Sequence, residues 1–415
     1  MNPIFDRKSF VADPEAHKMS DGRLYVYGSL DISGKNDYCS QQYKVFSTDD
    51  PKLEKWTDHG ISFSNTEGKE QVAWRRRFNL YAPDAIEKDG KYYLYLCGPT
   101  GYEGVAISEK PEGPFNDATK LECADGDGID PAVFVDDDGQ GYLLWGQFRL
   151  RGAKLTDDMQ SIQKDSIKEC ILSENEHGFH EGASLRKRNG KYYIVFCDIS
   201  RGKATCLSYA MSDHPLGPYE KKGTIIDNCY CDPSSWNNHG SIEEYKGQWY
   251  VFYHRCSQDM RYSRRACVEK IFFNDDGTIN EVEMTSQGAS DPIDAFSKID
   301  ASIACRVKGC YIGTDKDGLS GEVLNSKSEN EWLGNWAEYK YLNFGKGATS
   351  VSICAKGSCD IKLALLGENE IAKINIDSDE YKIYNASIPK TEGVQPLWLI
   401  FNGEASVMYF EFYNV

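Results

Sequence analysis

The chain has 415 residues, of which 40% are hydrophobic and 13% aromatic, so it can bury a sizeable core and is not disordered. It carries 64 acidic and 47 basic residues, and the resulting net charge of −17 argues against nucleic acid and anionic membranes as partners. No stretch approaches the roughly 18 consecutive apolar residues of a membrane helix. A neutral substrate is expected, and the length allows two or three domains.

A short pattern recurs five times in the first 255 residues: a turn residue and a glycine, then a strand rich in tyrosine and branched apolar residues. The glycines are Gly22, Gly90, Gly139, Gly190 and Gly247, at intervals of about 50 to 70 residues. Asp-Gly and Asn-Gly pairs favour tight hairpin turns, and nearly continuous apolar strands are typical of strands covered on both faces. The pattern predicts a five-bladed β-propeller.

In chain order, the central blade strands are expected at 23–27, 91–97, 140–144, 191–197 and 248–252, and the last propeller strand at 266–273. The polar, turn-forming segment 286–292 indicates a linker. Further short strands are expected at 337–344, 349–354, 360–366, 397–401 and 408–413. They predict a jelly-roll-like β-sandwich. The expected domains are a catalytic propeller at 1–285 and a sandwich at 286–415.

Three carboxylates occupy one position of the repeat. Nine residues before the repeat glycine stand Asp13, Asp130 and Glu181 in three copies and Tyr81 in a fourth, and His239 stands eight residues before the fifth glycine. Equivalent positions of a closed array lie on one ring, so the carboxylates are expected to surround one active site, although any single one could be a turn residue. Crowded carboxylates shift one another's pKa values, which allows the division into acid and base that acetal cleavage needs.

The fourteen cysteines lack the spacing of a zinc site. Cys229-Tyr-Cys231 and Cys305…Cys310 are not paired C-x-x-C motifs, so free thiols are expected. Residues 1–8 contain no apolar signal core. Free thiols are typical of reducing compartments, and a cytoplasmic location is expected.

Five motifs over about residues 8–285 resemble glycoside hydrolase family 43, whose members are five-bladed propellers acting as arabinofuranosidases, xylosidases and arabinanases. The motifs are Ala12-Asp-Pro-Glu-Ala-His17, Leu80-Tyr-Ala-Pro-Asp84, Ile129-Asp-Pro-Ala-Val-Phe134, His180-Glu-Gly-Ala-Ser184 and Asn237-Asn-His-Gly-Ser-Ile242. The resemblance implies an exo-acting, inverting glycosidase that releases L-arabinofuranose or D-xylose from xylan-derived oligosaccharides.

The resemblance also implies catalytic roles. Asp13 is expected to be the general base, Glu181 the general acid, and Asp130 the residue that tunes and orients the acid. For inversion, Asp13 and Glu181 should stand roughly 6.5–9.5 Å apart. His239 matches a histidine that in some members contacts a calcium ion through its water shell, and a structural role is the alternative. No organic cofactor is expected.

Sugar binding is expected from Arg264, Tyr81, Ala82 and Trp145. A solvated charge is the alternative for Arg264, and a shift of the motif by one residue would make Arg265 the sugar-binding arginine. The loop at 60–80 is expected to help wall the pocket.

The C-terminal segment more weakly resembles a family 6 carbohydrate-binding module, through residues 334–341 and 393–403. Trp336 and Trp398 are expected to pack in its core, and whether the domain binds sugar or is purely structural stays open. Three other functions were weighed against the glycosidase: a propeller lectin or interaction scaffold, an arabinan-cleaving hydrolase, and a fructan-cleaving propeller. The last uses an Asn-Asp-Pro motif where this chain has Ala12-Asp13-Pro14.

Overall fold

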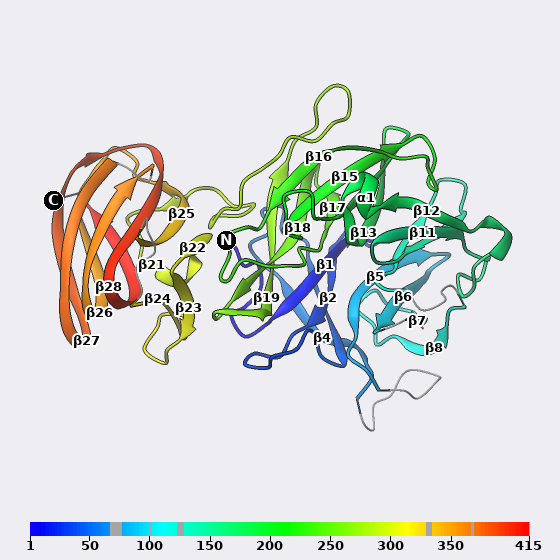
Figure 1. The fold of residues 1–415 in the computed structure, drawn as a ribbon, viewed down its shortest axis with the longest axis horizontal. Helices are drawn as coiled ribbons and strands as arrows, with labels where there is room; N and C mark the ends of the chain where they lie inside the picture. The colour runs from blue at the N-terminus through cyan, green and yellow to red at the C-terminus, as the bar shows by residue number, and fades with distance from the viewer. Residues whose placement is uncertain (67–76, 100, 123–127, 329–333, 367–368, 415) are drawn as a thin grey trace.

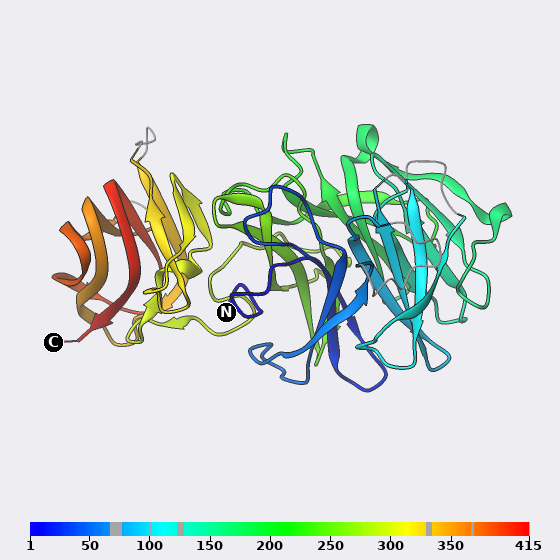
Figure 2. The same ribbon diagram turned by 90° about the horizontal axis from the view of Figure 1, so that it is seen from below.

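The computed structural model describes residues 1–66, 77–99, 101–122, 128–328, 334–366 and 369–414. This part is almost entirely β, with a four-residue helix α1 (Glu174–His177) and the 3-10 turns η1 (Lys164–Ser166) and η2 (Ala301–Ile303). Figures 1 and 2 show a propeller and a smaller β-rich lobe side by side. Trp74, in the loop expected to wall the pocket, lies outside the described residues.

Five antiparallel sheets form the propeller, as predicted. They comprise β1 (Val11–Lys18), β2 (Leu24–Leu30), β3 (Gln42–Thr48) and β4 (Thr57–Ser64); β5 (Tyr81–Lys88), β6 (Lys91–Gly98), β7 (Tyr102–Ser108) and β8 (Asn116–Lys120); β9 (Ala132–Val135), β10 (Gly141–Trp145), β11 (Arg149–Lys154) and β12 (Lys168–Ser173); β13 (Phe179–Arg188), β14 (Lys191–Asp198), β15 (Cys206–Ser212) and β16 (Glu220–Asp227); and β17 (Ser241–Tyr245), β18 (Gln248–Ser257) and β19 (Met260–Ile271). The first strand of each blade contacts that of the next, and β17 contacts β1, which closes the ring.

The repeat turns and the N-terminus explain how the ring is built. Asn189 and Gly190 have φ angles of 50° and 74°, the left-handed pair of a tight hairpin turn, which the Asn-Gly sequence predicts. The fifth blade has three strands, and the N-terminal segment lies along its outer edge. There the Ile4 amide donates to the Ala266 carbonyl (3.0 Å), and the Val268 amide donates to the Asn2 side chain (2.9 Å). The two ends of the propeller sequence are thereby joined.

The C-terminal domain is β-rich and surrounds one apolar core. Its strands are β20 (Ile293–Asp294), β21 (Ile299–Asp300), β22 (Arg306–Lys308), β23 (Cys310–Thr314), β24 (Glu322–Ser326), β25 (Asn335–Asn343), β26 (Ala348–Leu365), β27 (Asn369–Thr391) and β28 (Val394–Tyr413). Trp336 and Trp398 pack together with ring centroids 4.6 Å apart. The two strands expected at 349–354 and 360–366 are one continuous strand, β26, and β27 was not predicted.

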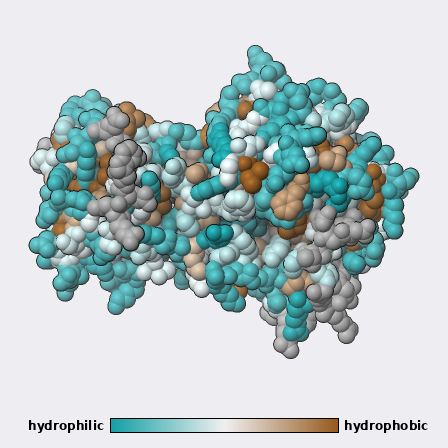
Figure 3. Space-filling model, in the orientation of Figure 1, coloured by the Kyte–Doolittle hydropathy of each residue, from teal (hydrophilic) through white to brown (hydrophobic). Residues whose placement is uncertain are grey.

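In the described residues the cysteines are free, and all of them except Cys170 and Cys229 are buried. The face shown in Figure 3 is mainly hydrophilic over both lobes. No helix within the described ranges is long and apolar enough to cross a membrane.

Candidate active site

A pocket with a volume of about 210 Å³ lies where the innermost strands of the blades begin. The structure brings the five equivalent positions of the repeat together in its wall: Asp13, Tyr81, Asp130, Glu181 and His239. Asp13, Tyr81 and Glu181 stand at or near the starts of β1, β5 and β13, and the other two just precede β9 and β17. Every blade therefore contributes to one site.

The local backbone turns these side chains into the pocket. Asp13 and Asp130 have φ angles of 53° and 55°, a left-handed conformation that is strained for residues with a side chain. The pairing of β1 with β2 shifts register just after Ala12, and the pairing of β13 with β14 shifts on both sides of Glu181. Such bulges re-aim side chains next to active sites. Gly182 has φ +66°, and a Cβ on it would stand only 3.0 Å from the His239 ring.

Asp13 is a buried carboxylate held in its ionised form. Arg264 donates to it from Nη1 (2.8 Å), and the Asp13 amide donates to Nδ1 of His254 (3.2 Å). Burial alone would raise the pKa of Asp13, but the charge of Arg264, together with His254 and His239, outweighs burial and keeps the pKa well below its usual value. An ionised carboxylate can take a proton from water, as a general base must.

In contrast to Asp13, the carboxyl groups of Asp130 and Glu181 have raised pKa values. Burial is the main cause that raises the pKa of both carboxyl groups. The negative charge of Glu181 also raises the pKa of Asp130, and the negative charge of Asp13 raises the pKa of both. Gln147 donates from Nε2 to Glu181 (2.7 Å), and the amide of Asp130 donates to Sγ of Cys97 (3.3 Å). The pair therefore retains a proton to higher pH than ordinary carboxyl groups do, which suits a general acid and its partner.

Arg264 and Arg265 have separate partners. Arg264 lines the pocket, and besides Asp13 it donates from Nε and Nη2 to the two carboxylate oxygens of Asp31 (2.9 Å each). Arg265 instead pairs with Glu322 of the C-terminal domain. The structure thus places Arg264, and not Arg265, at the site. Its guanidinium is already engaged with two carboxylates, so orientation of Asp13 is part of its role.

Trp145, which was expected to bind sugar, does not lie in the pocket wall. Its side chain is fully buried in an apolar cluster with Leu143 and Ala153, and it is not among the residues that line the pocket. Trp145 ends the central strand β10, which is covered on both faces. Tyr81 and Ala82, also predicted, do line the pocket.

Several pocket residues were missed by the sequence reasoning. They are Tyr38, Cys39, Ile129, Gln147, His180, Trp236 and Asn237. Trp236 is 40% exposed at the pocket, and its ring meets that of His180 edge-on with centroids 5.6 Å apart. The available signal was its place immediately before the Asn237-Asn-His motif. Gln147 had no signal, because it belongs to a loop whose path depends on the neighbouring blade.

His239 is placed between two of the carboxylates. Its Nδ1 lies 3.9 Å from a carboxylate oxygen of both Asp13 and Asp130, and burial lowers its pKa to about 4, so the ring is neutral at neutral pH. Calcium takes six to eight oxygen ligands, more than these side chains supply. The residues therefore fit a calcium ion only if water supplies most of its ligands.

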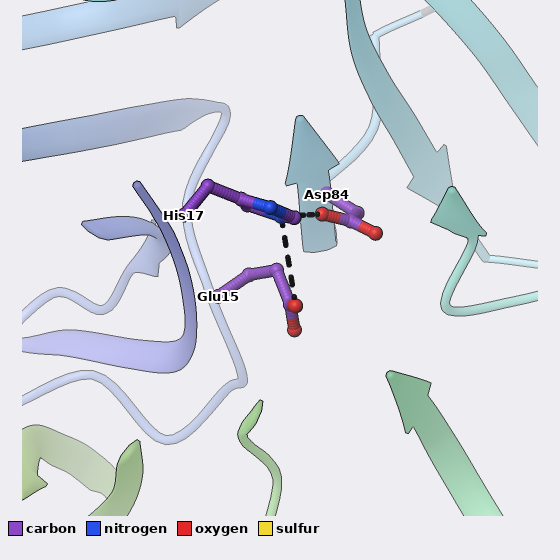
Figure 4. Close-up of side chains that lie close together, drawn as sticks. All are labelled: Glu15, His17 and Asp84. Atoms are coloured by element: carbon purple, nitrogen blue, oxygen red, sulfur yellow. Dashed lines mark hydrogen bonds and ion pairs between the residues drawn. The ribbon is translucent and has the colours of Figure 1, made fainter. Parts of the chain in front are cut away.

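A second buried cluster lies beyond Asp13 along β1 (Figure 4). His17 Nε2 lies 2.6 Å from an Asp84 carboxylate oxygen and 3.7 Å from Glu15. These three side chains could hold a metal ion by type and distance, but Arg186 donates from Nη2 to Glu15 (2.6 Å). The guanidinium of Arg186 therefore already supplies the positive charge that a metal ion would bring to these carboxylates. Arg186 also donates from Nε to Glu243 (2.9 Å), so the cluster ties together four blades.

Comparison with known proteins identifies the family. The profile described as glycosyl hydrolases family 43 matches residues 1–279. A xylosidase/arabinosidase of Thermoclostridium stercorarium is 29% identical, over 98% of this chain and 96% of the relative. Xylosidase/arabinosidase 43A of Humicola insolens is 34% identical, over 65% of this chain and 96% of the relative.

Solved structures agree. CoXyl43, a β-xylosidase/α-arabinofuranosidase from a compost metagenome, was solved with xylotriose in a calcium-free form; it is 31% identical, covers 68% of this chain and 97% of its own, and has a TM-score of 0.59. An arabinoxylan arabinofuranohydrolase of Bacillus subtilis, solved with cellotetraose, is 23% identical and shares the fold over 100% of this chain and 97% of its own, with a TM-score of 0.58. Taken with the carboxylate pocket, these matches show that the chain is a glycoside hydrolase and belongs to glycosyl hydrolases family 43.

Proposed function

We propose that the enzyme removes single L-arabinofuranose or D-xylose residues from the ends of xylan-derived oligosaccharides, with inversion of configuration. In this mechanism Glu181 protonates the leaving oxygen while Asp13 activates water on the opposite face of the sugar. Asp130, whose pKa is raised by burial and by the charge of Glu181, tunes and orients the acid. The observation that carries the proposal is that one pocket holds Asp13 against the guanidinium of Arg264, with a lowered pKa, and Glu181 buried beside the neutral amide of Gln147, with a raised pKa.

Pocket size supports exo action. Pockets for drug-sized ligands occupy about 300–1,000 Å³, whereas this pocket has about 210 Å³. That volume suits about one sugar residue. Trp236 and Tyr38, at the wall, offer apolar ring faces against which a sugar can pack.

Paired substrates test the proposal. The p-nitrophenyl glycosides of α-L-arabinofuranose and β-D-xylose should be hydrolysed, and short arabinoxylo-oligosaccharides should yield only monosaccharide. Internal fragments released from polymeric xylan or arabinan would contradict exo action. Sugar binding without turnover by the parent enzyme would favour the lectin alternative, which the family match already disfavours.

Calcium and location are further parts of the proposal. His239, Asp13 and Asp130 are the residues that would adjoin a calcium ion held through water; the ion would add positive charge near the site. The calcium-free form named for CoXyl43 supports testing this: added calcium should raise the melting temperature, and a chelator should reverse the rise.

A cytoplasmic location is supported by the free thiols of the described residues, and fractionation of the source cells tests it.

A further inference from the structure

Two consecutive arginines on β19 engage two different parts of the molecule. Arg264 donates to Asp13 in the pocket (2.8 Å), whereas Arg265 donates to both carboxylate oxygens of Glu322 (2.8 and 2.5 Å). Glu322 begins β24 of the C-terminal domain. Arg265 and Glu322 are 2% and 3% exposed. Successive strand residues point to opposite faces, so the two arginines reach different partners. Because they are consecutive in β19, their two ion pairs share one short stretch of backbone.

Arg265 also contacts the segment that leads into β1. It donates from Nη2 to the Arg7 carbonyl (2.9 Å), and its guanidinium lies 4.5 Å from the centroid of the Phe10 ring. The Phe10 carbonyl in turn accepts from the amide of Asp31 (2.8 Å), the residue that pairs with Arg264. Arg265 is therefore linked to both partners of the Arg264–Asp31 ion pair: to Arg264 as its neighbour in the chain, and to Asp31 through Phe10.

We propose that Glu322 is a positioning residue for the catalytic base, acting from the C-terminal domain through Arg265 on the Arg264–Asp13 pair. Removing one partner of a buried ion pair leaves an uncompensated charge. Without Glu322, Arg265 has to move toward water or another acceptor, and the backbone that it shares with Arg264 moves with it. This inference rests on the proposed role of Asp13 as the base.

The expected effect is specific to catalysis. A displacement of about 1 Å at a catalytic group costs about 100-fold in rate, so Glu322→Gln should lower kcat by about 10- to 100-fold. Water must be activated whatever group leaves, so the loss should be equal for a p-nitrophenyl glycoside and for xylobiose. KM should change little, because most of the pocket wall comes from other strands.

A second contact between the same domains supplies the control. Lys327, the residue that follows β24, pairs with Asp259 (2.8 Å). Both side chains are 43% exposed, so this ion pair contributes little to the contact between the domains. Lys327→Ala should keep the parental kcat. Glu322→Asp, which retains the charge, should restore most of the activity that Glu322→Gln loses. Circular dichroism and melting curves of the full chain establish that each variant is folded at the assay temperature.

The outcomes separate this proposal from the proposed function. A folded Glu322→Gln enzyme with parental kcat, or with a raised KM and unchanged kcat, would contradict the positioning role. If that variant does not fold, Arg265→Lys carries the comparison, because lysine cannot donate to both carboxylate oxygens of Glu322 as Arg265 does; parental kcat in a folded Arg265→Lys enzyme would contradict the proposal. Parental turnover by Asp13→Ala would instead contradict the proposed function itself.

Discussion

Asp13 and Glu181 line one pocket, yet different neighbours shift their pKa values in opposite directions. Asp13 faces the guanidinium of Arg264, whose charge favours the ionised form. Glu181 is buried against Gln147, a neutral donor, and burial raises its pKa. The sequence could predict the three carboxylates because they recur at one repeat offset, but these pKa directions depend on partners that come from other blades.

Alanine substitutions should distinguish base from acid. Asp13→Ala should lower kcat by about 10²–10⁴-fold for every substrate, because no water is activated. Glu181→Ala should lower kcat by a similar factor for xylobiose but far less for a p-nitrophenyl glycoside, whose leaving group needs no proton. Steady-state kinetics with both substrates provide the measurement. Equal losses with both substrates in Glu181→Ala would remove Glu181 from the acid role.

Asp130→Asn should move the basic limb of the pH–rate profile to lower pH. The charge of Glu181 raises the pKa of Asp130, which means that the two buried carboxyl groups repel each other when both are ionised and the pair retains a proton. A neutral amide at position 130 removes this repulsion, so Glu181 should lose its proton at a lower pH. A general acid is active only while protonated, and activity is lost as pH rises through its pKa. The profile of kcat with xylobiose tests this, and an unchanged or upward-shifted basic limb would contradict it.

At the scale of elements, turn chemistry was more predictable than strand length. The Asn-Gly and Asp-Gly turns predicted the central strands of the blades, since few other residues adopt consecutive positive φ angles. β26 continues through Gly357, where a break was expected. Its pairing with β27 shifts register between Ala355 and Gly357 and continues, and its pairing with β28 is in register at Gly357. β27 was missed because many of its residues are exposed and polar, such as Asp377 and Lys382. Tertiary pairing decides such strands.

The buried network around Arg186 should stabilise the propeller. It links β13 to Glu15 on β1 and Glu243 on β17. Arg186→Met leaves both carboxylates without that partner and should reduce the free energy of unfolding by about 3–5 kcal/mol, measured by denaturant unfolding. Lys191→Ala removes an exposed ion pair with Asp213 and should leave the free energy of unfolding nearly unchanged. Equal costs in the two variants would contradict a stabilising role for the network.

At the scale of the whole molecule, the C-terminal domain is joined to segments that form the pocket. The Val307 amide donates to the Tyr230 carbonyl (2.7 Å), and the amide of Ile312 donates to Asp232. These propeller residues precede Trp236 in the same loop. No sequence pattern predicted this contact. It joins residues about 80 positions apart, and their side chains are of types that are common in any turn or strand. The likeness of this domain to a family 6 carbohydrate-binding module stays a prediction.

The anomeric form of the first product tests the central claim most directly. If Asp13 activates water while Glu181 protonates the leaving group in one step, the sugar released first has the configuration opposite to that of the substrate. Proton NMR of β-D-xyloside hydrolysis, recorded before mutarotation, should therefore show α-D-xylose first. Initial release of β-D-xylose would mean retention through a covalent intermediate and would contradict the roles given to both residues.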